Sequence, residues 1–222
     1  MTRLLYIKSS PRGAASRSTA LADAYLTALQ GWIDDLAVDT LDLSATRLPD
    51  YDGDKVAAKM TVITGQAHDA AQKTAWDEIT EMAGRFIAAD IYLIATPMWN
   101  GSIPYRLKQY IDLIHQPGLL WTLDPASGYA GLLTGKRAVL ALTAGAFGPD
   151  MPSPAFGVDH QSSYLRFWLN QAGVTDIDIL RFQPSLLTAD PEAAFQQAVQ
   201  TAVQAAGQVP HAPAGQPAAR TA

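Results

Sequence analysis

The chain has 222 residues, of which 48% are hydrophobic and 17% are charged, and its formal net charge at pH 7 is -5. This length suits one buried domain better than two, and no basic run is long enough to follow a phosphate backbone, so nucleic acid is not an expected partner. Cysteine is absent, which excludes disulfides, thiolate nucleophiles and cysteine-ligated zinc.

The first predicted elements are a strand and a helix. The strand covers residues 3–8, and its apolar run is too short for a secretory signal or a membrane span, so we expect a cytoplasmic protein with no membrane partner. After it, apolar residues recur from Leu21 to Trp32 at i, i+3, i+4, i+7, i+8 and i+11, which is the spacing of one helix face.

The middle of the chain repeats this order. A second strand over residues 38–43 leads through a polar, proline-bearing connection to a longer helix, and a third strand over residues 90–96 has a continuous apolar centre. Such strands are typical of parallel sheets that are covered on both faces. Pro104 suits the first turn of the next helix. The apolar stripes of the two helices are Ala75, Ile79, Met82 and Phe86, then Ile103, Leu107, Tyr110, Ile111 and Ile114.

The last third of the chain adds two strands and two helices. A fourth strand over residues 137–142 precedes a Gly- and Pro-rich stretch, 145–157, which is too long for an ordinary turn and is a candidate lid. A helix that ends at Gly173 and a fifth strand over residues 174–181 follow. The apolar stripe of the final helix is Phe195, Val199, Ala202 and Val203.

Strands that alternate with helices predict βαβ units around a parallel sheet, here with five strands and five helices. We expect one α/β domain over residues 1–206. Residues 207–222 consist mainly of Ala, Pro, Gly and Gln. Because this composition cannot bury enough apolar surface to offset the entropy of ordering, we expect a disordered tail.

Ligands of open parallel sheets bind outside the carboxyl ends of the strands, and the loop after the first strand is the first candidate. It contains Ser10, Ser16, Arg17 and Ser18 around the start of a helix. Free N–H groups and the positive end of the helix dipole favour a phosphate there, and the hydroxyls can donate further hydrogen bonds. Capping alone would explain one of Ser16 and Ser18, but it does not require so many donors. Neither the Gly-rich dinucleotide pattern nor the Walker pattern occurs.

The loops after the third and fourth strands are the second and third candidates. The second loop contains Met98, Trp99, Asn100 and Gly101. Trp99 could lie against a planar heterocycle, although an isolated tryptophan is more often a buried anchor. The third loop contains Thr143, Ala144, Gly145 and Ala146. These small residues permit a close approach to the backbone, although a simple turn that needs glycine is the alternative.

Four motifs occur in a fixed order: Lys8-Ser9-Ser10, Ser16-Arg17-Ser18, Pro97-Met98-Trp99-Asn100 and Gly131-Leu132-Leu133-Thr134-Gly135-Lys136. From Arg3 to about Arg181 the chain resembles the FMN-dependent NADH:quinone oxidoreductases, also called azoreductases. The resemblance implies a flavodoxin-like, doubly wound, five-stranded parallel sheet of order 2-1-3-4-5. It also implies FMN at the switch point and a homodimer with a site at each subunit interface.

The resemblance further implies a ping-pong reaction in which two electrons pass from NADH or NADPH to a quinone or an azo compound. Because the cofactor does this chemistry, no catalytic side chain is named. Ser10 and residues 16–18 would hold the phosphate, residues 98–101 would flank the isoalloxazine, and residues 143–146 would meet its pyrimidine side. Trp121 would line the acceptor pocket, with a role in the core or in a dimer contact as the alternative.

The chain departs from the family at several positions. Trp99 stands where tyrosine is common, Gln171 stands where an apolar or aromatic residue is common, and residues 143–146 replace the frequent Ser-Arg-Gly-Gly. The choice of electron acceptor in the family therefore cannot be assigned to this chain. His115 and His160 lie near these loops, but a lone histidine is more often packed or solvated, and no histidine cluster has metal-ligand spacing.

Two other functions stay open at this point. A flavodoxin-like FMN electron carrier, without turnover of a small molecule, is permitted by the acidic charge. The long 145–157 stretch and Trp121 argue against a carrier, because both would enclose a pocket that a carrier does not need. A relative that has lost the flavin and serves as an interaction protein is the second alternative.

Overall fold

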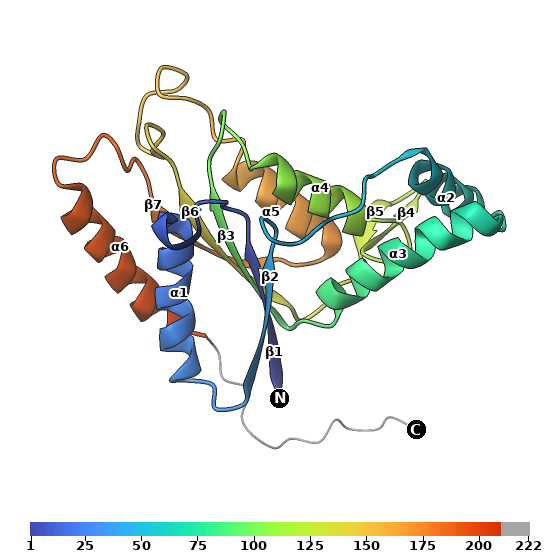
Figure 1. The fold of residues 1–222 in the computed structure, drawn as a ribbon, viewed down its shortest axis with the longest axis horizontal. Helices are drawn as coiled ribbons and strands as arrows, with labels where there is room; N and C mark the ends of the chain where they lie inside the picture. Colours follow the sequence, from blue (N-terminus) through green and yellow to red (C-terminus); the bar gives the residue numbers. More distant parts are fainter. Residues whose placement is uncertain (210–222) are drawn as a thin grey trace.

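The computed structural model describes residues 1–209, in which the five predicted strands and five predicted helices are joined by one further helix and a two-stranded hairpin (Figure 1). The strands are β1 (Thr2–Lys8), β2 (Leu36–Asp42), β3 (Ile91–Pro97), β4 (Trp121–Asp124), β5 (Gly128–Gly131), β6 (Arg137–Thr143) and β7 (Asp176–Phe182). The helices are α1 (Arg17–Gln30), α2 (Gly53–Thr64), α3 (Ala70–Ile87), α4 (Tyr105–Ile114), α5 (Ser162–Ala172) and α6 (Pro191–Ala206), with a short 3-10 turn η1 (Gly13–Ala15) before α1.

The central sheet has five parallel strands in the order β2-β1-β3-β6-β7. When only the strands of this sheet are numbered along the chain, the order is 2-1-3-4-5, as predicted. Leu5 of β1 lies opposite Asp39 of β2 on one side and Tyr92 of β3 on the other. The chain first moves outward from β1 to β2 and then returns to the other side of β1, so the switch point lies between β1 and β3.

Helices cover both faces of the sheet. Leu4 and Tyr6 of β1 pack with α1 and α6, whereas Leu5 and Ile7 pack on the opposite face with α3, α4 and α5. Successive side chains of a strand point to opposite faces, so a strand buried on both faces needs apolar residues at every position. This explains the continuous apolar runs in the sequence.

α2 was missed in the sequence, where its segment was expected to be a polar connection. The buried residues of α2 are Lys55, Ala58 and Thr61, so the inward face has helical spacing but only one apolar member. Asp52 caps the start by accepting a hydrogen bond from the Lys55 N–H at 3.1 Å, and Gly65 ends the helix with φ 69°. These two caps were the available signal.

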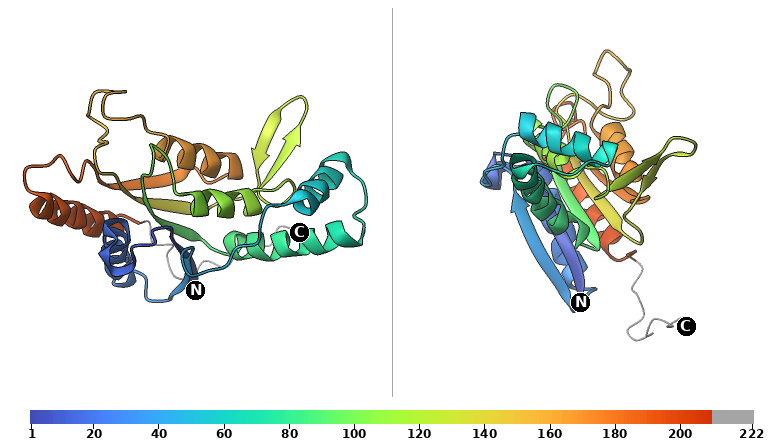
Figure 2. Two further views of the ribbon diagram at one scale, coloured as in Figure 1. Left: turned by 45° about the horizontal axis from the view of Figure 1, so that its top comes forward. Right: turned by 90° about the vertical axis from the view of Figure 1, so that its right-hand side faces the viewer.

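The antiparallel hairpin of β4 and β5 was also missed. It projects to one side of the sheet together with α2, away from α1 and α6 (Figure 2). The hairpin meets the end of α5 at Gly131 and Gly173, where the two backbones nearly touch. A Cβ atom on Gly131 would lie 2.2 Å from the backbone nitrogen of Gly173, so only glycine fits.

The described chain continues for three residues past α6, into the segment that was expected to begin the tail. Residues 207–209 form a turn after α6, and Val209 is buried with the core residues on that face. Trp32 was expected on the first helix, but α1 ends at Gln30. A Cβ on Gly207 would lie 3.4 Å from the Trp32 indole, so this turn packs closely against it. The rest of the predicted tail, residues 210–222, lies outside the described residues.

Candidate functional site

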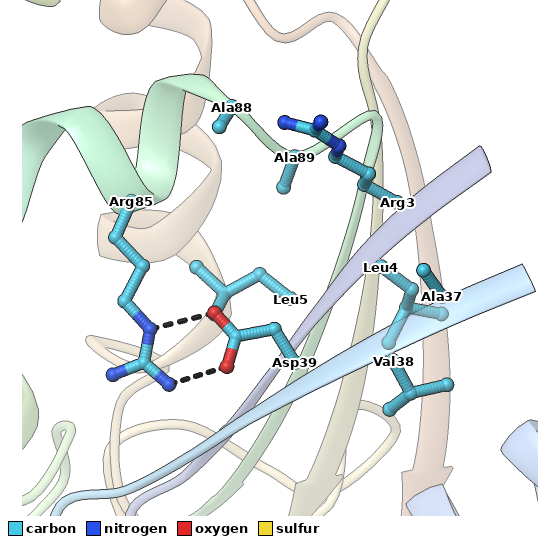
Figure 3. Close-up of a pocket in the computed structure, with 9 residues that line it drawn as sticks. All are labelled: Arg3, Leu4, Leu5, Ala37, Val38, Asp39, Arg85, Ala88 and Ala89. Atoms are coloured by element: carbon cyan, nitrogen blue, oxygen red, sulfur yellow. Dashed lines mark hydrogen bonds and ion pairs between the residues drawn. The ribbon is translucent and has the colours of Figure 1, made fainter. Parts of the chain in front are cut away.

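Two cavities of similar volume lie at opposite ends of the sheet. The first, about 220 Å³, lies at the amino ends of β1 and β2 beside the end of α3 (Figure 3). Its floor is mostly apolar, and Arg85 donates two hydrogen bonds to the Asp39 carboxylate at 2.7 and 2.6 Å. The second, about 210 Å³, lies at the carboxyl ends, where open parallel sheets bind their ligands. The second cavity is therefore the candidate site.

The second cavity brings together loops that follow β1, β3, β6 and β7. It is lined by Ser10, Arg12, Ser16, Arg17, Ser18, Pro97, Met98, Trp99, Thr143, Ala144, Gly145, Ser185 and Leu186. Nine of the residues singled out in the sequence are in this set, which combines all three candidate loops. Asn100, Gly101, Ala146 and Trp121 are not in it. No acidic side chain lines the cavity, so its local charge is positive although the chain is acidic.

The hydroxyl groups at one end of the cavity are buried. Ser10, Ser16 and Ser18 have side chains almost closed to solvent. Ser16 caps α1, because its Oγ accepts a hydrogen bond from the Thr19 N–H at 3.3 Å, and its Oγ also lies 3.2 Å from that of Ser18. Capping thus accounts for Ser16, while Ser10 and Ser18 add hydroxyl groups beside the free N–H groups of the same helix N-terminus, where an anion binds favourably.

The two arginines of the first loop differ in their contacts. Arg17 donates a hydrogen bond to Glu192 at 2.7 Å, and its guanidinium lies 4.4 Å from the centre of the Phe195 ring. The side chain of Arg17 is therefore directed to α6. Arg12, which was not singled out in the sequence, has no hydrogen-bond or ion-pair partner for its guanidinium among residues 1–209. Its position between Ser10 and Ser16 was the signal that could have found it.

Trp99 begins a tight turn at the edge of the cavity. The Trp99 N–H donates to the Ser102 carbonyl at 2.8 Å, and the Ser102 N–H donates back at 3.0 Å. The two residues between them, Asn100 and Gly101, both have positive φ, 50° and 81°. This is the combination of a type I′ turn, for which Asn-Gly is the preferred pair. Trp99 is 38% exposed, so it is not the buried anchor that was its alternative in the sequence.

Backbone hydrogen bonds connect the loops around the cavity. The Met98 N–H donates to the Thr143 carbonyl at 2.7 Å, and the Ser185 and Leu186 N–H groups donate to the carbonyls of Ala144 and Gly145 at 2.8 and 2.9 Å. The Leu186 side chain lies close over Gly145, since a Cβ built on Gly145 would be 2.9 Å from its Cδ1. The third loop is thus more than a simple turn.

Ser185 and Leu186 were missed in the sequence. They follow β7, the neighbour of β6, so the predicted strand order already placed this loop at the same edge of the sheet. Within the candidate lid, residues 145–157, no helix or strand forms. Its first residue, Gly145, lines the cavity, and Gly148 packs against Pro184 of the β7 loop.

Trp121 does not reach the cavity in this chain. It is buried at the start of β4, where its Nε1 donates to the His115 carbonyl at 3.2 Å and its ring meets Tyr129 edge-on at 5.1 Å. Within a single chain, Trp121 is therefore a core residue, which was one of the two alternatives to a role in the acceptor pocket. Burial lowers the pKa of His115, whose Nε2 lies 3.0 Å from the Gln171 Oε1, and neither side chain lines the cavity.

His160 also has a structural contact, because its backbone N–H donates to the Gly101 carbonyl at 3.1 Å beside the turn. Among residues 1–209 no group of three acidic or histidine side chains is placed to hold a metal ion. Within the same residues, no helix combines the length and the apolar character that a membrane crossing needs.

Comparison with known proteins agrees with this geometry. A family model described as a flavodoxin-like fold matches residues 2–206. An FMN-dependent NADH:quinone oxidoreductase of Ruegeria pomeroyi is 46% identical over 199 residues, which is 90% of this chain and 97% of that protein. FMN-dependent NADH:quinone oxidoreductase 3 of Pseudomonas fluorescens is 35% identical over 209 residues, 94% of this chain and 97% of that protein.

Solved structures show the same fold. A FMN-dependent NADH-azoreductase of Bacillus anthracis, solved in complex with FMN, has a TM-score of 0.83 at 23% identity, with 95% of this chain and 100% of that chain covered. At this identity the likeness supports the fold alone. The curated relatives carry the assignment further, because they share far more sequence over nearly their whole length. The chain belongs to the flavodoxin-like family of FMN-dependent NADH:quinone oxidoreductases.

Proposed function

We propose that the chain is an FMN-dependent oxidoreductase that passes two electrons from NADH or NADPH to a quinone or an azo compound. One observation carries the proposal. Buried serines and two arginines at a helix N-terminus share a cavity, free of acidic residues, with an exposed tryptophan on a tight turn. The relatives are named for FMN, NADH and quinones, and the structural neighbours for azo compounds. When bound, the flavin supplies the hydride and electron chemistry.

The residues fit FMN from its phosphate to its ring. Ser10, Ser16 and Ser18, with N–H groups of the first turn of α1, would bind the phosphate. On the other side, residues 98–101 would contact the ring through the Trp99 side chain and the N–H groups of the turn. Residues 143–146 would approach its pyrimidine edge, where N–H groups can stabilise negative charge.

The acceptor side of the site differs from the family pattern. Ala144 and Ala146 stand where the family often has an arginine and a glycine, so one cation near the ring is absent and a methyl group is added two residues later. The candidate lid, residues 145–157, would exclude water from the acceptor. These differences support a distinct acceptor preference within quinones and azo compounds, which a panel of both classes would measure.

We also propose a homodimer. Val56, Met60 and Ile63 form an exposed apolar stripe along α2, and Tyr105 and Phe167 are exposed as well. Large apolar side chains that gather on one helix face often mark a protein–protein contact. A partner copy packed on this side could bring Trp121 and the β4–β5 hairpin toward its site. Light scattering of the purified chain would show about twice the chain mass, and the mass of one chain would exclude the dimer.

Steady-state turnover and spectra test the proposed enzyme. The purified protein should be yellow, or become so with FMN, and anaerobic NADH should bleach it. Addition of a quinone or an azo dye should restore the colour and sustain NADH oxidation. Bleaching without turnover of any acceptor would support the FMN carrier, which the names of the relatives do not favour. A preparation that stays colourless with FMN would support the interaction protein. Cell fractionation would test the proposed cytoplasmic location.

A further inference from the structure

Arg12 and Arg17 line the proposed phosphate end of the cavity, and one of them, Arg17, already has partners within the protein. Arg17 is paired with Glu192 and stacked over Phe195, both on α6. Hydrogen bonds from Gln196 and Arg17 lower the pKa of Glu192, so the carboxylate stays charged as a partner. The Arg17 side chain therefore contacts α6, and its guanidinium is already paired with a carboxylate.

Arg12 is not engaged in this way. It lies between Ser10 and Ser16, its backbone N–H approaches the Ser10 Oγ at 3.5 Å, and its side chain lines the cavity. Among residues 1–209 its guanidinium has no hydrogen-bond or ion-pair partner. A guanidinium offers several N–H donors in a planar fork that matches two phosphate oxygens, and charge-assisted pairs of this kind are the stronger hydrogen bonds.

The charge distribution favours a role for this free cation. The chain as a whole carries a formal charge of -5, which repels a dianion, yet no Asp or Glu lines the cavity. A favourable local potential must therefore come from the helix N-terminus and the arginines. Because Arg17 is paired with Glu192, Arg12 is the lining arginine whose guanidinium has no protein partner among residues 1–209.

We propose that Arg12, rather than Arg17, pairs with the terminal phosphate of FMN and gives the site its preference for FMN over riboflavin. This inference rests on the proposed function, because it assigns one residue within the FMN site. Arg12 acts on the phosphate alone, so its removal should weaken FMN and leave riboflavin, which lacks the phosphate, almost unaffected. Arg17 keeps its contacts with α6 in the loaded protein.

Flavin binding by the intact chain, followed through quenching of flavin fluorescence, tests the inference. Arg12→Ala should raise the Kd of FMN roughly tenfold or more, as expected for loss of a charge-assisted pair. Its Kd for riboflavin should stay within about twofold, and Arg12→Lys should fall between the wild type and Arg12→Ala. Arg47→Ala is the matched control, because Arg47 is exposed, has no ion pair among the described residues and does not line the cavity. Added salt should shrink the difference between wild type and Arg12→Ala.

Three results would overturn the inference. The first is an FMN affinity of Arg12→Ala equal to that of the wild type. The second is an equal loss for FMN and riboflavin, which would indicate a structural role. The third is a selective loss of FMN in Arg17→Ala but not in Arg12→Ala. All three results require a wild type that binds FMN. If the wild type binds no flavin, the proposed function fails, and this outcome is distinct from a failure of the Arg12 assignment.

Discussion

Trp99 is placed by residues that do not themselves line the cavity. Asn100 and Gly101 close the turn that presents the indole, which is partly exposed at the site. Replacement of Trp99 by Ala removes the aromatic surface proposed to lie against the flavin. We expect the Kd of FMN to rise by about 2- to 10-fold, the usual worth of an aromatic contact, and the visible spectrum of the bound flavin to shift. Trp32→Ala, at the far end of the sheet, is the control. If Trp99→Ala keeps the wild-type spectrum and affinity, Trp99 does not contact the flavin ring.

His115 should make stability depend on pH. Burial lowers its pKa below the ordinary value of 6.5, because the charged ring is poorly solvated there. Well above pH 6.5 the ring is neutral in both the folded and the unfolded chain. As the pH falls below 6.5, the unfolded chain binds the proton first, so the free energy of unfolding decreases. Urea unfolding of wild type and His115→Gln between pH 7.5 and 5 tests this, and the slope should be smaller in the variant. Identical slopes would exclude His115 as the cause.

Residue type predicted which residues line the cavity better than it predicted the contacts of each side chain. Ser10, Ser16 and Ser18 could be found because hydroxyls before a helix have few other uses at that density. The contacts of Arg17 and Trp121 could not be read from local sequence, because Glu192 lies far along the chain from Arg17 and the hairpin that begins at Trp121 was not expected. A side chain that can bind a ligand can equally well bind its own protein, and only the fold decides between them.

At the scale of the elements, the close contact of β5 with the end of α5 requires glycine at position 131. Gly131→Ala places a Cβ against the backbone of Gly173, which cannot move as a flexible side chain would. We expect a loss of about 1–3 kcal/mol or more in the free energy of unfolding, typical of an overpacked core position. The control is Gly84→Ala inside α3, where the new methyl meets open space. It should be neutral or stabilising by about 0.5–1 kcal/mol. Urea titration measures both, and equal stability of the two variants would contradict the close approach.

The predicted elements and the missed elements differ in how their faces are buried. β1, β3 and β6 are buried on both faces, so their apolar runs identify them without any knowledge of neighbours. α2 and the hairpin lie at the side of the molecule, and most of their residues are exposed. Their local patterns are weak because few positions are constrained by a core, and the caps at Asp52 and Gly65 remain as the main evidence.

At the scale of the molecule, the proposed cofactor should stabilise the fold. Its cavity joins loops from four parallel strands, so a ligand there binds only when β1, β3, β6 and β7 are all in place. FMN at about 100 times its Kd should add about 2.7 kcal/mol, which for a chain of this size raises the Tm by about 5–10 °C. Differential scanning fluorimetry after FMN removal and after its return tests this. A Tm that FMN leaves unchanged would count against binding at these loops. Riboflavin, which lacks the phosphate, serves as the comparison ligand.

The fold could be predicted from the sequence because the same pattern of strand and helix recurs along the chain. Each βαβ unit has the same alternation of buried strand and amphipathic helix, and right-handed crossovers leave few ways to arrange them. The strand order came from the family resemblance, and the structure confirms it. The contribution of the β7 loop was not predicted, because Ser185 enters the site through backbone pairing with Ala144 that no local pattern encodes.

The two ends of the described chain lie opposite the cavity. Met1 pairs with Asp35 just before β2, and the turn at Gly207 packs on Trp32 after the end of α1, so both ends lie at the amino edge of the sheet. A protein joined at Met1, or to a chain cut after Val209, would therefore sit on the side away from the redox site. The molecule is thus suited to fusion with an enzyme that regenerates NADH, because the fused partner would leave the cavity open.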